Sequence, residues 1–230
     1  AVANATGLTP APDGLAFPPC GVDDLARVLR PAGVGGALHH AGQVEVISSL
    51  ERDSRPVFRD LRWGVYVTFS AEHEYVRRCF QEYGIVTDPS GEYASMYKPS
   101  HLIGLELGVS VASAALRNEP TGAADGWRAD CVATAKRPLA LGEVLDGEGG
   151  YTVWGKLMPA ADSAARRALP IGLAHHVKLK RDVPEGAVVS WDDVEHDTQS
   201  HAVRVRREME AAFAAPRAMA ERREAQALAT

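Results

Sequence analysis

The chain begins irregularly and then alternates between apolar and polar residues. Residues 1–42 are rich in Gly, Pro and Ala and contain one helical pattern, over 22–29, so we expect a loop-rich first segment. Apolar and polar residues then alternate along 44–47 and again along 57–69, and the charged segment 51–56 separates the two runs. A period of two is typical of half-buried strands, so the pattern predicts a β-hairpin.

The next two stretches have the spacing of helices. Residues 71–83 place Tyr75, Cys79 and Phe80 on one face, and the glycine that follows is suited to a helix C-cap. Residues 99–116 predict a second helix with apolar side chains nearly all round. A helix of that kind needs cover on every side, so we expect it to be the buried helix of the first domain.

The second half of the chain has the pattern of short strands. Residues 118–126 have the composition of a linker, and the chain from there to about residue 195 is strand-like. Two segments in it, 135–146 and 179–190, resemble each other, since each has a basic strand, a turn with glycine and an apolar strand. Two such units bury one face each against the other, which predicts a small β-clip. Residues 203–228 predict a charged, Ala-rich helix, either solvated or packed on a subunit.

The composition limits the classes of protein to consider. Of the 230 residues 46% are hydrophobic and 24% are charged, which excludes wholesale disorder, and the formal net charge of −5 gives no basic field for a nucleic acid. The three cysteines have no C-x-x-C spacing, which argues against a disulfide framework and a structural zinc site. No apolar run is long enough to span a bilayer, and the first residues are not a secretory signal. We expect a cytoplasmic protein without nucleic-acid or membrane partners.

The predicted hairpin carries the first candidate site. Ser49, Arg52 and Arg62 combine a hydroxyl group with planar guanidinium groups that bond two oxygens at once, which suits a phosphate or carboxylate on a substrate. Ordinary solvation of charges on an exposed hairpin is the alternative, and it stays open.

The second candidate site lies at the start of the predicted apolar helix. Tyr97 and Lys98 precede Ser100 and His101, which fall in a first helical turn where free N–H groups attract anions. His101 is a candidate general acid or base, and Glu106 is an ionisable group on an otherwise apolar helix, which is costly unless it is paired. A purely structural pair of Glu106 with a Lys or Arg is the alternative.

The third candidate site is the glycine-rich segment 146–156. Its Tyr151 and Lys156 are candidates to donate a proton to a developing alkoxide, and its glycines would let the backbone approach a ligand. Lys136 and Arg137 are candidate contacts for a phosphate. Simple turns and a solvated strand edge are the alternatives.

Two common site types are missing from the sequence. There is no G-x-G-x-x-G after a predicted strand and no G-x-x-x-x-G-K-[ST], so the chain is not expected to bind a dinucleotide by itself. The adjacent histidines of 39–40 and 175–176 point apart on a strand or helix and make poor joint metal ligands, so we predict no metal site from them.

Several of these segments, taken together, resemble a known family over roughly residues 1–212. The strings that carry the resemblance are 4–7, 17–25, 48–53, 59–66, 97–106, 147–157 and 169–175. They are similar to the predicted homoserine dehydrogenase family with a C-terminal SAF (antifreeze-like) domain, which includes the deoxyxylulose phosphate reductoisomerase-like enzyme.

The resemblance implies an NAD(P)-dependent oxidoreductase of three parts: an amino-terminal Rossmann domain, a central substrate domain that also builds a dimer, and a C-terminal β-clip. This chain begins where the family's sequence leaves the Rossmann domain. NADP or NAD is therefore expected to be held mostly by a domain outside this sequence or by a separate nucleotide-binding chain, with Asn4, Thr6 and Gly7 as the residues here that touch it.

The fold expected from pattern and resemblance together is α+β. We expect a loop-rich segment over 1–42, then a central mixed α/β domain for substrate, catalysis and dimerisation over 43–126. A small all-β SAF-like β-clip over 127–199 and a charged helix over 200–230 would follow.

The leading hypothesis is the substrate-binding and catalytic half of a reductase or reductoisomerase, homoserine dehydrogenase-like or reductoisomerase-like, that acts on a small polyhydroxylated or phosphorylated carbonyl compound. Lys98, His101 and Arg62 would hold and polarise the substrate. The proton would be handled by one of Glu106, Tyr151 and Lys156.

Three further possibilities stay open. A ketol-type rearrangement would be helped by a divalent cation, with Glu51, Asp53 or Glu148 as ligands. The chain is alternatively an enzyme of cofactor-free acid–base chemistry, such as an isomerase, cyclase or lyase. It is alternatively a non-catalytic ligand-binding or assembly module.

Overall fold

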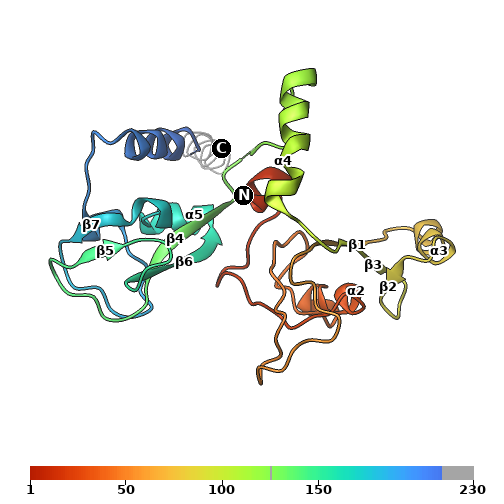
Figure 1. Ribbon diagram of the computed structural model, residues 1–230. Helices are drawn as coiled ribbons and strands as arrows, with labels where there is room; N and C mark the ends of the chain where they lie inside the picture. Colours follow the sequence, from red (N-terminus) through yellow and green to blue (C-terminus); the bar gives the residue numbers. More distant parts are fainter. Residues whose placement is uncertain (125, 214–230) are drawn as a thin grey trace, which may run out of the picture. The chain divides into compact units, whose positions relative to one another are not determined.

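Helices and antiparallel strands occur together along the chain, which confirms the predicted α+β class (Figure 1). The computed structural model describes residues 1–124 and 126–213. The chain divides into two units, Ala1–Gly126 (unit 1) and Trp127–Thr230 (unit 2), which we describe separately. None of the helices within the described residues has the length and apolar character to cross a bilayer.

The first segment of unit 1 is mostly irregular, as predicted. It holds the short helices α1 (Val2–Thr6) and α2 (Leu25–Val28) and the 3-10 turn η1 (Ala32–Val34). A small core forms around α2, in which Leu25 is fully buried and Tyr66 and Ile47 pack against it. The irregular segment is thereby attached to the sheet that follows.

The sheet of unit 1 has three antiparallel strands in the order β1-β3-β2, and β1 lies at an edge. Their bounds are β1 (Val65–Ser70), β2 (Val86–Thr87) and β3 (Tyr93–Lys98). The helix α3 (Glu74–Glu82) connects β1 to β2, close to the bounds predicted for it.

The predicted hairpin is only partly correct. Residues 44–47 form no strand, and β1 takes only the end of the second run, but an antiparallel bridge between Leu50 and Pro56 closes the charged turn. Val44 N donates to Thr9 O at 3.0 Å and Ser48 N donates to Pro18 O at 3.0 Å. Val46 N donates to the carboxylate of Glu45. The backbone donors of Val44, Val46 and Ser48 are thus used by the first segment and by a neighbouring side chain, and not by a ladder with β1.

The face predicted for α3 is only partly correct. Phe80 is buried and meets Phe69 edge to face, with 5.4 Å between ring centroids, and Gly84 follows the helix with a φ of 65° as a C-cap glycine does. Tyr75, however, is 70% exposed. The core beneath α3 is too small to cover the whole apolar face.

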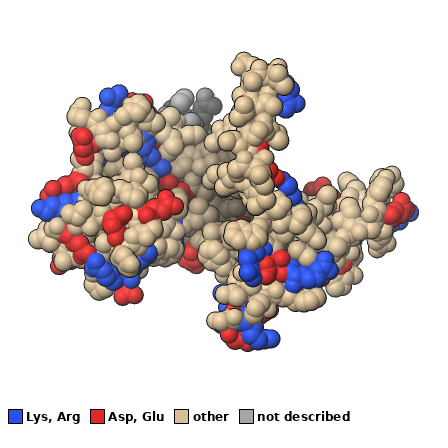
Figure 2. Space-filling view, viewed as in Figure 1, with Lys and Arg blue, Asp and Glu red and all other residues tan. Residues whose placement is uncertain are grey.

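The second predicted helix is present but its predicted burial is wrong. It consists of α4 (Ile103–Ala112) and a π-helical turn, η2 (Ser113–Arg117). Ile103, Leu105 and Val109 are 76%, 82% and 67% exposed. The helix projects from the sheet of unit 1, and its surface is uncharged over most of its length (Figures 1 and 2). The apolar composition of a helix indicates that burial would stabilise it, but it does not identify the residues that would pack against it.

Unit 2 contains two small antiparallel sheets. In one, β4 (Ala129–Ala135) pairs with β6 (Val153–Pro159) over seven residues. The other has the order β5-β7-β8, with β5 (Val144–Asp146), β7 (His175–Leu179) and β8 (Val194–Glu195). The sequence did not predict α5 (Ala160–Arg166) or the 3-10 turns η3 (Ile171–Leu173) and η4 (Trp191–Asp193).

The two similar segments of unit 2 bond to each other at equivalent positions. Ala135 N donates to Ala187 O at 2.9 Å, and at the equivalent place Leu179 N donates to Glu143 O at 2.8 Å. The core is continuous across both segments, with Leu139 and its equivalent Val183 both buried in it. Each of the two similar segments therefore covers the other, as the repeat predicted.

A charged helix spans residues 201–213, and the rest of the predicted helix lies outside the described residues. Arg206 binds the carboxylate of Asp130 on β4 and also Glu210, and its guanidinium lies 4.7 Å from the ring centre of Trp127. Arg207 lies 4.0 Å from the ring centre of Trp191. The helix is thus attached to unit 2 by paired arginines and is not merely solvated.

Candidate functional site

One carboxylate joins the predicted catalytic residues of unit 1. Lys98 is the last residue of β3, and Glu106 lies in the first turn of α4. Glu106 forms an ion pair through Oε1 with Lys98 Nζ, and its Oε2 lies 2.7 Å from His101 Nδ1. The structure thus joins three residues of the second candidate site, including the pair of Glu106 with a lysine given as the structural alternative, and we refer to Lys98, His101 and Glu106 as the Lys98 cluster.

The turn before β1 fixes the position of His101 and Lys98. Trp63 O accepts a hydrogen bond from His101 N at 2.7 Å. At Gly64 a Cβ atom would lie 2.5 Å from Lys98 O and even closer to the side chain of Leu61, so only glycine lets the two segments approach this closely. Local sterics therefore hold the end of β3 against the turn.

The Lys98 cluster is accessible to a ligand. The side chains of Lys98, His101 and Glu106 are 57%, 56% and 32% exposed. An ionised carboxylate only accepts hydrogen bonds, so His101 carries its hydrogen on Nδ1, and Nε2 remains to face a substrate. The cluster can therefore present an ammonium and an imidazole to one ligand, with a carboxylate that contacts both.

Tyr97 and Ser100 flank the cluster but do not join it. Successive residues of a strand point to opposite faces, so Tyr97 lies on the other face of the sheet from Lys98. Ser100 lies in the connection between β3 and α4. We have no contact in the described residues that assigns either a role.

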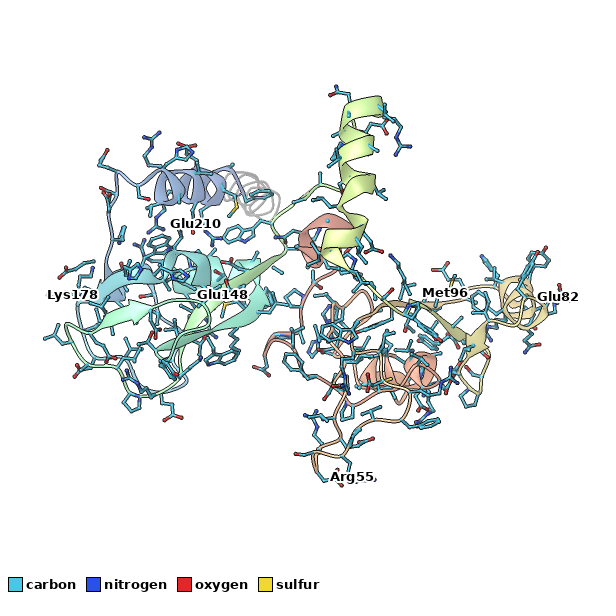
Figure 3. All side chains as sticks on the ribbon, in the orientation of Figure 1. Arg55, Glu82, Met96, Glu148, Lys178 and Glu210 are labelled. Atoms are coloured by element: carbon cyan, nitrogen blue, oxygen red, sulfur yellow. The ribbon has the colours of Figure 1, made fainter. Side chains whose placement is uncertain are left out.

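Two of the three predicted anion-binding residues of the hairpin line one cavity, and the third does not. Ser49 and Arg62 both contribute to a cavity of about 750 Å³ in unit 1. Arg62 forms an ion pair of 3.0 Å with Asp60 and is 53% exposed. Arg52 instead donates to Ala16 O. Figure 3 shows Arg55 at the far end of the same loop, where it pairs with Asp53.

Most polar groups that line this cavity already have partners. The Glu45 carboxylate accepts from the backbone N–H groups of Ala16, Phe17 and Val46 and from the side chain of Gln43. Tyr66 Oη donates to Glu45 O at 2.7 Å, and burial raises the pKa of this phenol. The rest of the lining is predominantly apolar, so the cavity offers few free polar groups.

Glu45 is a buried residue that the sequence analysis did not single out. It is 9% exposed, and its four donors compensate the cost of removing a carboxylate from water. The available signal was an acidic residue between Val44 and Val46, in a run read only for its alternation.

The remaining predicted catalytic and phosphate-binding residues lie in unit 2. Tyr151 is 87% exposed, and Lys156 is paired with Val132 in the ladder of β4 and β6. Lys136 Nζ donates to Gly150 O, and Arg137 forms an ion pair with Glu143. The side chains of Lys136 and Arg137 are thus engaged within their own unit.

The loop before Tyr151 is held by Asp146. The carboxylate accepts from the hydroxyl of Thr152 and from the backbone N–H groups of Tyr151 and Thr152. These hydrogen bonds, the Thr152 hydroxyl first, lower the pKa of Asp146 to about 2. The loop is ordered by its own hydrogen bonds.

The residues predicted to touch a nucleotide lie on α1 and at its end. Thr6 Oγ1 donates to Val2 O at 2.8 Å, and Gly7 has a φ of 78° as the C-cap. The described residues hold no glycine-rich turn between a strand and a helix, so they do not fit a dinucleotide without help from another polypeptide.

The proposed metal ligands are not gathered into a site. Glu51 and Asp53 belong to unit 1 and Glu148 to unit 2, and the pKa of Asp53 is lowered by its bond to Arg55. Across the described ranges no three His, Cys, Asp or Glu residues lie close enough together to hold a metal ion. We therefore derive no step through a metal.

Comparison with known proteins now bears on this geometry. Residues 1–107 match the family described as "Oxidoreductase DRL, catalytic domain". These residues resemble an oxidoreductase catalytic domain. The DRL-like segment includes the whole Lys98 cluster and the turn that positions it, and it ends within α4. No curated protein matches the chain. The match confirms the oxidoreductase part of the predicted resemblance.

Proposed function

We propose that the chain is the substrate-binding and catalytic half of an NAD(P)-dependent oxidoreductase that reduces a small carbonyl compound at the Lys98 cluster. The observation that carries the proposal is the carboxylate of Glu106, which contacts both Lys98 and His101 inside the DRL-like segment. An ammonium, a carboxylate and an imidazole in contact form a proton-transfer chain beside an accessible surface.

The cluster handles the proton of the reduction. The carbonyl carbon takes a hydride, which a nicotinamide nucleotide supplies when bound, and the carbonyl oxygen takes a proton from Lys98 Nζ. Glu106 holds the ammonium in place and then passes the Nδ1 proton of His101 to the neutral amine, while His101 Nε2 takes a proton from solvent. The alcohol product leaves the cluster one proton short, and solvent restores it at the exposed ring of His101.

Charge near the cluster favours a substrate that carries oxygens or a phosphate. Arg62 lies one residue before Trp63, whose carbonyl positions His101, and its half-exposed guanidinium is paired with Asp60 through Nη2. A planar guanidinium binds a phosphate or carboxylate through two parallel bonds. A small phosphorylated or polyhydroxylated carbonyl compound, as in a reductoisomerase-like or homoserine dehydrogenase-like reaction, is the proposed substrate.

The proposal includes partners for the chain. Because the described residues do not fit a dinucleotide by themselves, another polypeptide segment is proposed to hold NADP or NAD, with Asn4, Thr6 and Gly7 at its edge. A homodimer is proposed from the resemblance.

The test measures nicotinamide absorbance with NADH or NADPH and a panel of sugar phosphates, sugar acids and homoserine. The chain is assayed alone and together with a nucleotide-binding polypeptide encoded beside it. Glu106→Gln keeps the shape of the side chain and removes its charge, so we expect turnover to fall by about 10²-fold or more. Glu92→Gln is the matched control, since Glu92 pairs with Arg77 elsewhere in unit 1 at similar exposure.

Two outcomes would count against the proposal. Equal turnover in Glu106→Gln and Glu92→Gln would remove the cluster from the reaction. Turnover of a substrate that needs Lys98 and His101 but consumes no nicotinamide would favour the cofactor-free isomerase, cyclase or lyase instead.

A further inference from the structure

The strand β1 is an edge strand without the features that usually protect an edge. It pairs with β3 along all six of its residues, Val65 to Ser70, and it is terminal in the strand order. Natural edge strands are kept from further pairing by short length, proline, charged side chains or bulges. The sequence of β1, Val-Tyr-Val-Thr-Phe-Ser, has none of these, and its pairing with β3 is regular.

The other edge of the same sheet is protected. β2 is only two residues long, Val86 and Thr87, and it pairs with β3 at those positions alone. The sheet therefore has one blunted edge and one long, regular and uncharged edge.

The outward backbone groups of β1 are unpaired within the described residues. In an antiparallel pair about half of the N–H and C=O groups point toward the partner and the other half point away. No backbone hydrogen bond in the described ranges joins Val65 to Ser70 to anything other than β3. The hydroxyl of Thr68 is likewise buried and has no partner among these residues.

An apolar cavity follows this edge over its whole length. All six residues of β1 line the cavity of about 750 Å³, and residues 41–47 line it as well. Both faces of β1 contribute, since Val67 and Thr68 point to opposite sides of the sheet. Val67 is 53% exposed, and Met96, its partner on β3 and labelled in Figure 3, is 57% exposed.

We infer that the free edge of β1 binds an extended strand from another polypeptide. An apolar small molecule would fill the space but leave the outward backbone groups of β1 without hydrogen bonds, whereas an added strand supplies both side chains and the missing ladder. The site is thus an interaction surface for a strand, and it shares Arg62 with the substrate proposed for the Lys98 cluster.

Charge defines the strand and its direction. Of the described residues that line the cavity, Arg62 is the only lysine or arginine and Glu45 the only acid. The Glu45 carboxylate already has four donors, whereas the half-exposed side chain of Arg62 pairs through Nη2 with Asp60 alone among the described residues. Arg62 lies just before β1, so an antiparallel strand would bring its carboxyl end to Arg62. The partner strand is uncharged and apolar along its length and carries a carboxylate at that end.

The test uses the full chain and a seven-residue peptide of alternating valine and threonine with an acetylated amino end and a free carboxylate. Its binding is measured by calorimetry and by amide hydrogen exchange. We expect saturable binding and a slowing of about tenfold or more at alternate amides of β1, because an added ladder protects them. The amides of β2 serve as an internal reference.

Two comparisons separate backbone pairing from simple filling of the cavity. The same peptide with N-methyl groups on its pairing amides keeps the side chains and loses the ladder, so its affinity should fall by about tenfold or more. Arg62→Ala should weaken the unmodified peptide by a similar factor, and Arg59→Ala should not. Arg59 is the matched control, because it pairs with Asp23 at the same distance and is equally exposed.

Several results would overturn the inference. These are the absence of saturable binding, equal affinity of the N-methylated peptide, protection at β2 in place of β1, and equal affinity for Arg62→Ala and Arg59→Ala. If the peptide displaces added dodecanoate from the cavity but leaves hydrogen exchange along β1 unchanged, the site is a small-molecule cavity instead. None of these results depends on whether the chain reduces a carbonyl compound.

Discussion

Leu139 and Val183 exchange two backbone hydrogen bonds, each 2.9 Å long, at equivalent positions of the two similar segments of unit 2. The same symmetry relates the two turn glycines, since Gly142 N donates to Leu179 O and Gly186 N donates to Ala135 O, both at 2.9 Å. Each segment thus completes its hydrogen bonds on the other. The resemblance read from the sequence has a direct counterpart in the pairing of the chain.

The two turn glycines should therefore have similar importance for stability. Gly142 and Gly186 have φ values of 83° and 75°, a conformation that costs other residues strain. We expect Gly142→Ala and Gly186→Ala each to lower the free energy of unfolding by about 1 kcal/mol, measured by urea denaturation. Gly172→Ala is the control, because Gly172 has no positive φ and a Cβ atom there meets nothing within 4 Å. A large difference between the two turn variants would argue against the symmetry.

The attachment of the helix at 201–213 should depend on one ion pair. Arg206 and Asp130 are 13% and 8% exposed, so removal of either leaves a poorly solvated charge. We expect Arg206→Ala to lower the free energy of unfolding by about 3 kcal/mol and to change the fluorescence of Trp127, which the guanidinium covers. Arg204→Ala, at an exposed position of the same helix, should change neither. If Arg206→Ala leaves Trp127 fluorescence unaltered, the helix is held by other contacts.

Asp146 should make unit 2 sensitive to acid. Its pKa is about 2 in the folded chain and about 3.9 in an unfolded one, so folding favours the ionised form. The stabilisation is complete above the unfolded value and is lost as the pH falls through the folded value. Thr152→Val removes the first cause of the shift, and we expect a carboxyl NMR titration to show a higher pKa for Asp146. An unchanged titration would assign the shift to the backbone N–H groups alone.

The uncovered face of α4 should mediate self-association. The one ionisable residue in α4, Glu106, is already bonded to Lys98 and His101, so two copies would not repel each other there. We expect sedimentation velocity to show a dimer that Leu105→Glu with Val109→Glu converts to a monomer. Tyr75→Glu, at an equally exposed position on α3, is the control. A monomeric unmodified chain would contradict the prediction.

The features that the sequence predicted correctly are those that depend on residues close together along the chain. The helix α3, its glycine cap and the repeat of unit 2 depend on local patterns, and the structure confirms them. The segment 44–47 alternates as a strand does, but its hydrogen bonds are decided by Thr9 and Pro18, distant residues that no local pattern names. The prediction that α4 is buried was wrong for the same reason, since the residues that could pack against a helix are distant from it in the sequence.

The candidate site shows the same division. The residue types of the Lys98 cluster were recognisable, because an acid on an apolar helix needs a partner, but the sequence did not say that Glu106 serves both Lys98 and His101. Glu45 was missed because two of its four donors, the backbone N–H groups of Ala16 and Phe17, come from a distant segment of the chain. The Lys98 cluster lies within residues 1–107, the segment that resembles an oxidoreductase catalytic domain.

The use of the first segment by residues 43–48 limits how the chain can be shortened. The carbonyl groups of Thr9 and Pro18 accept hydrogen bonds from Val44 N and Ser48 N. The backbone N–H of Ala16 donates to the buried carboxylate of Glu45. A fragment that began at Gly21 would keep β1, β3 and the Lys98 cluster. The buried carboxylate of Glu45 would lose its donors Ala16 N and Phe17 N. The loops before α2 therefore supply hydrogen bonds that residues 43–48 need. A fragment that keeps all of them has to start ahead of Thr9.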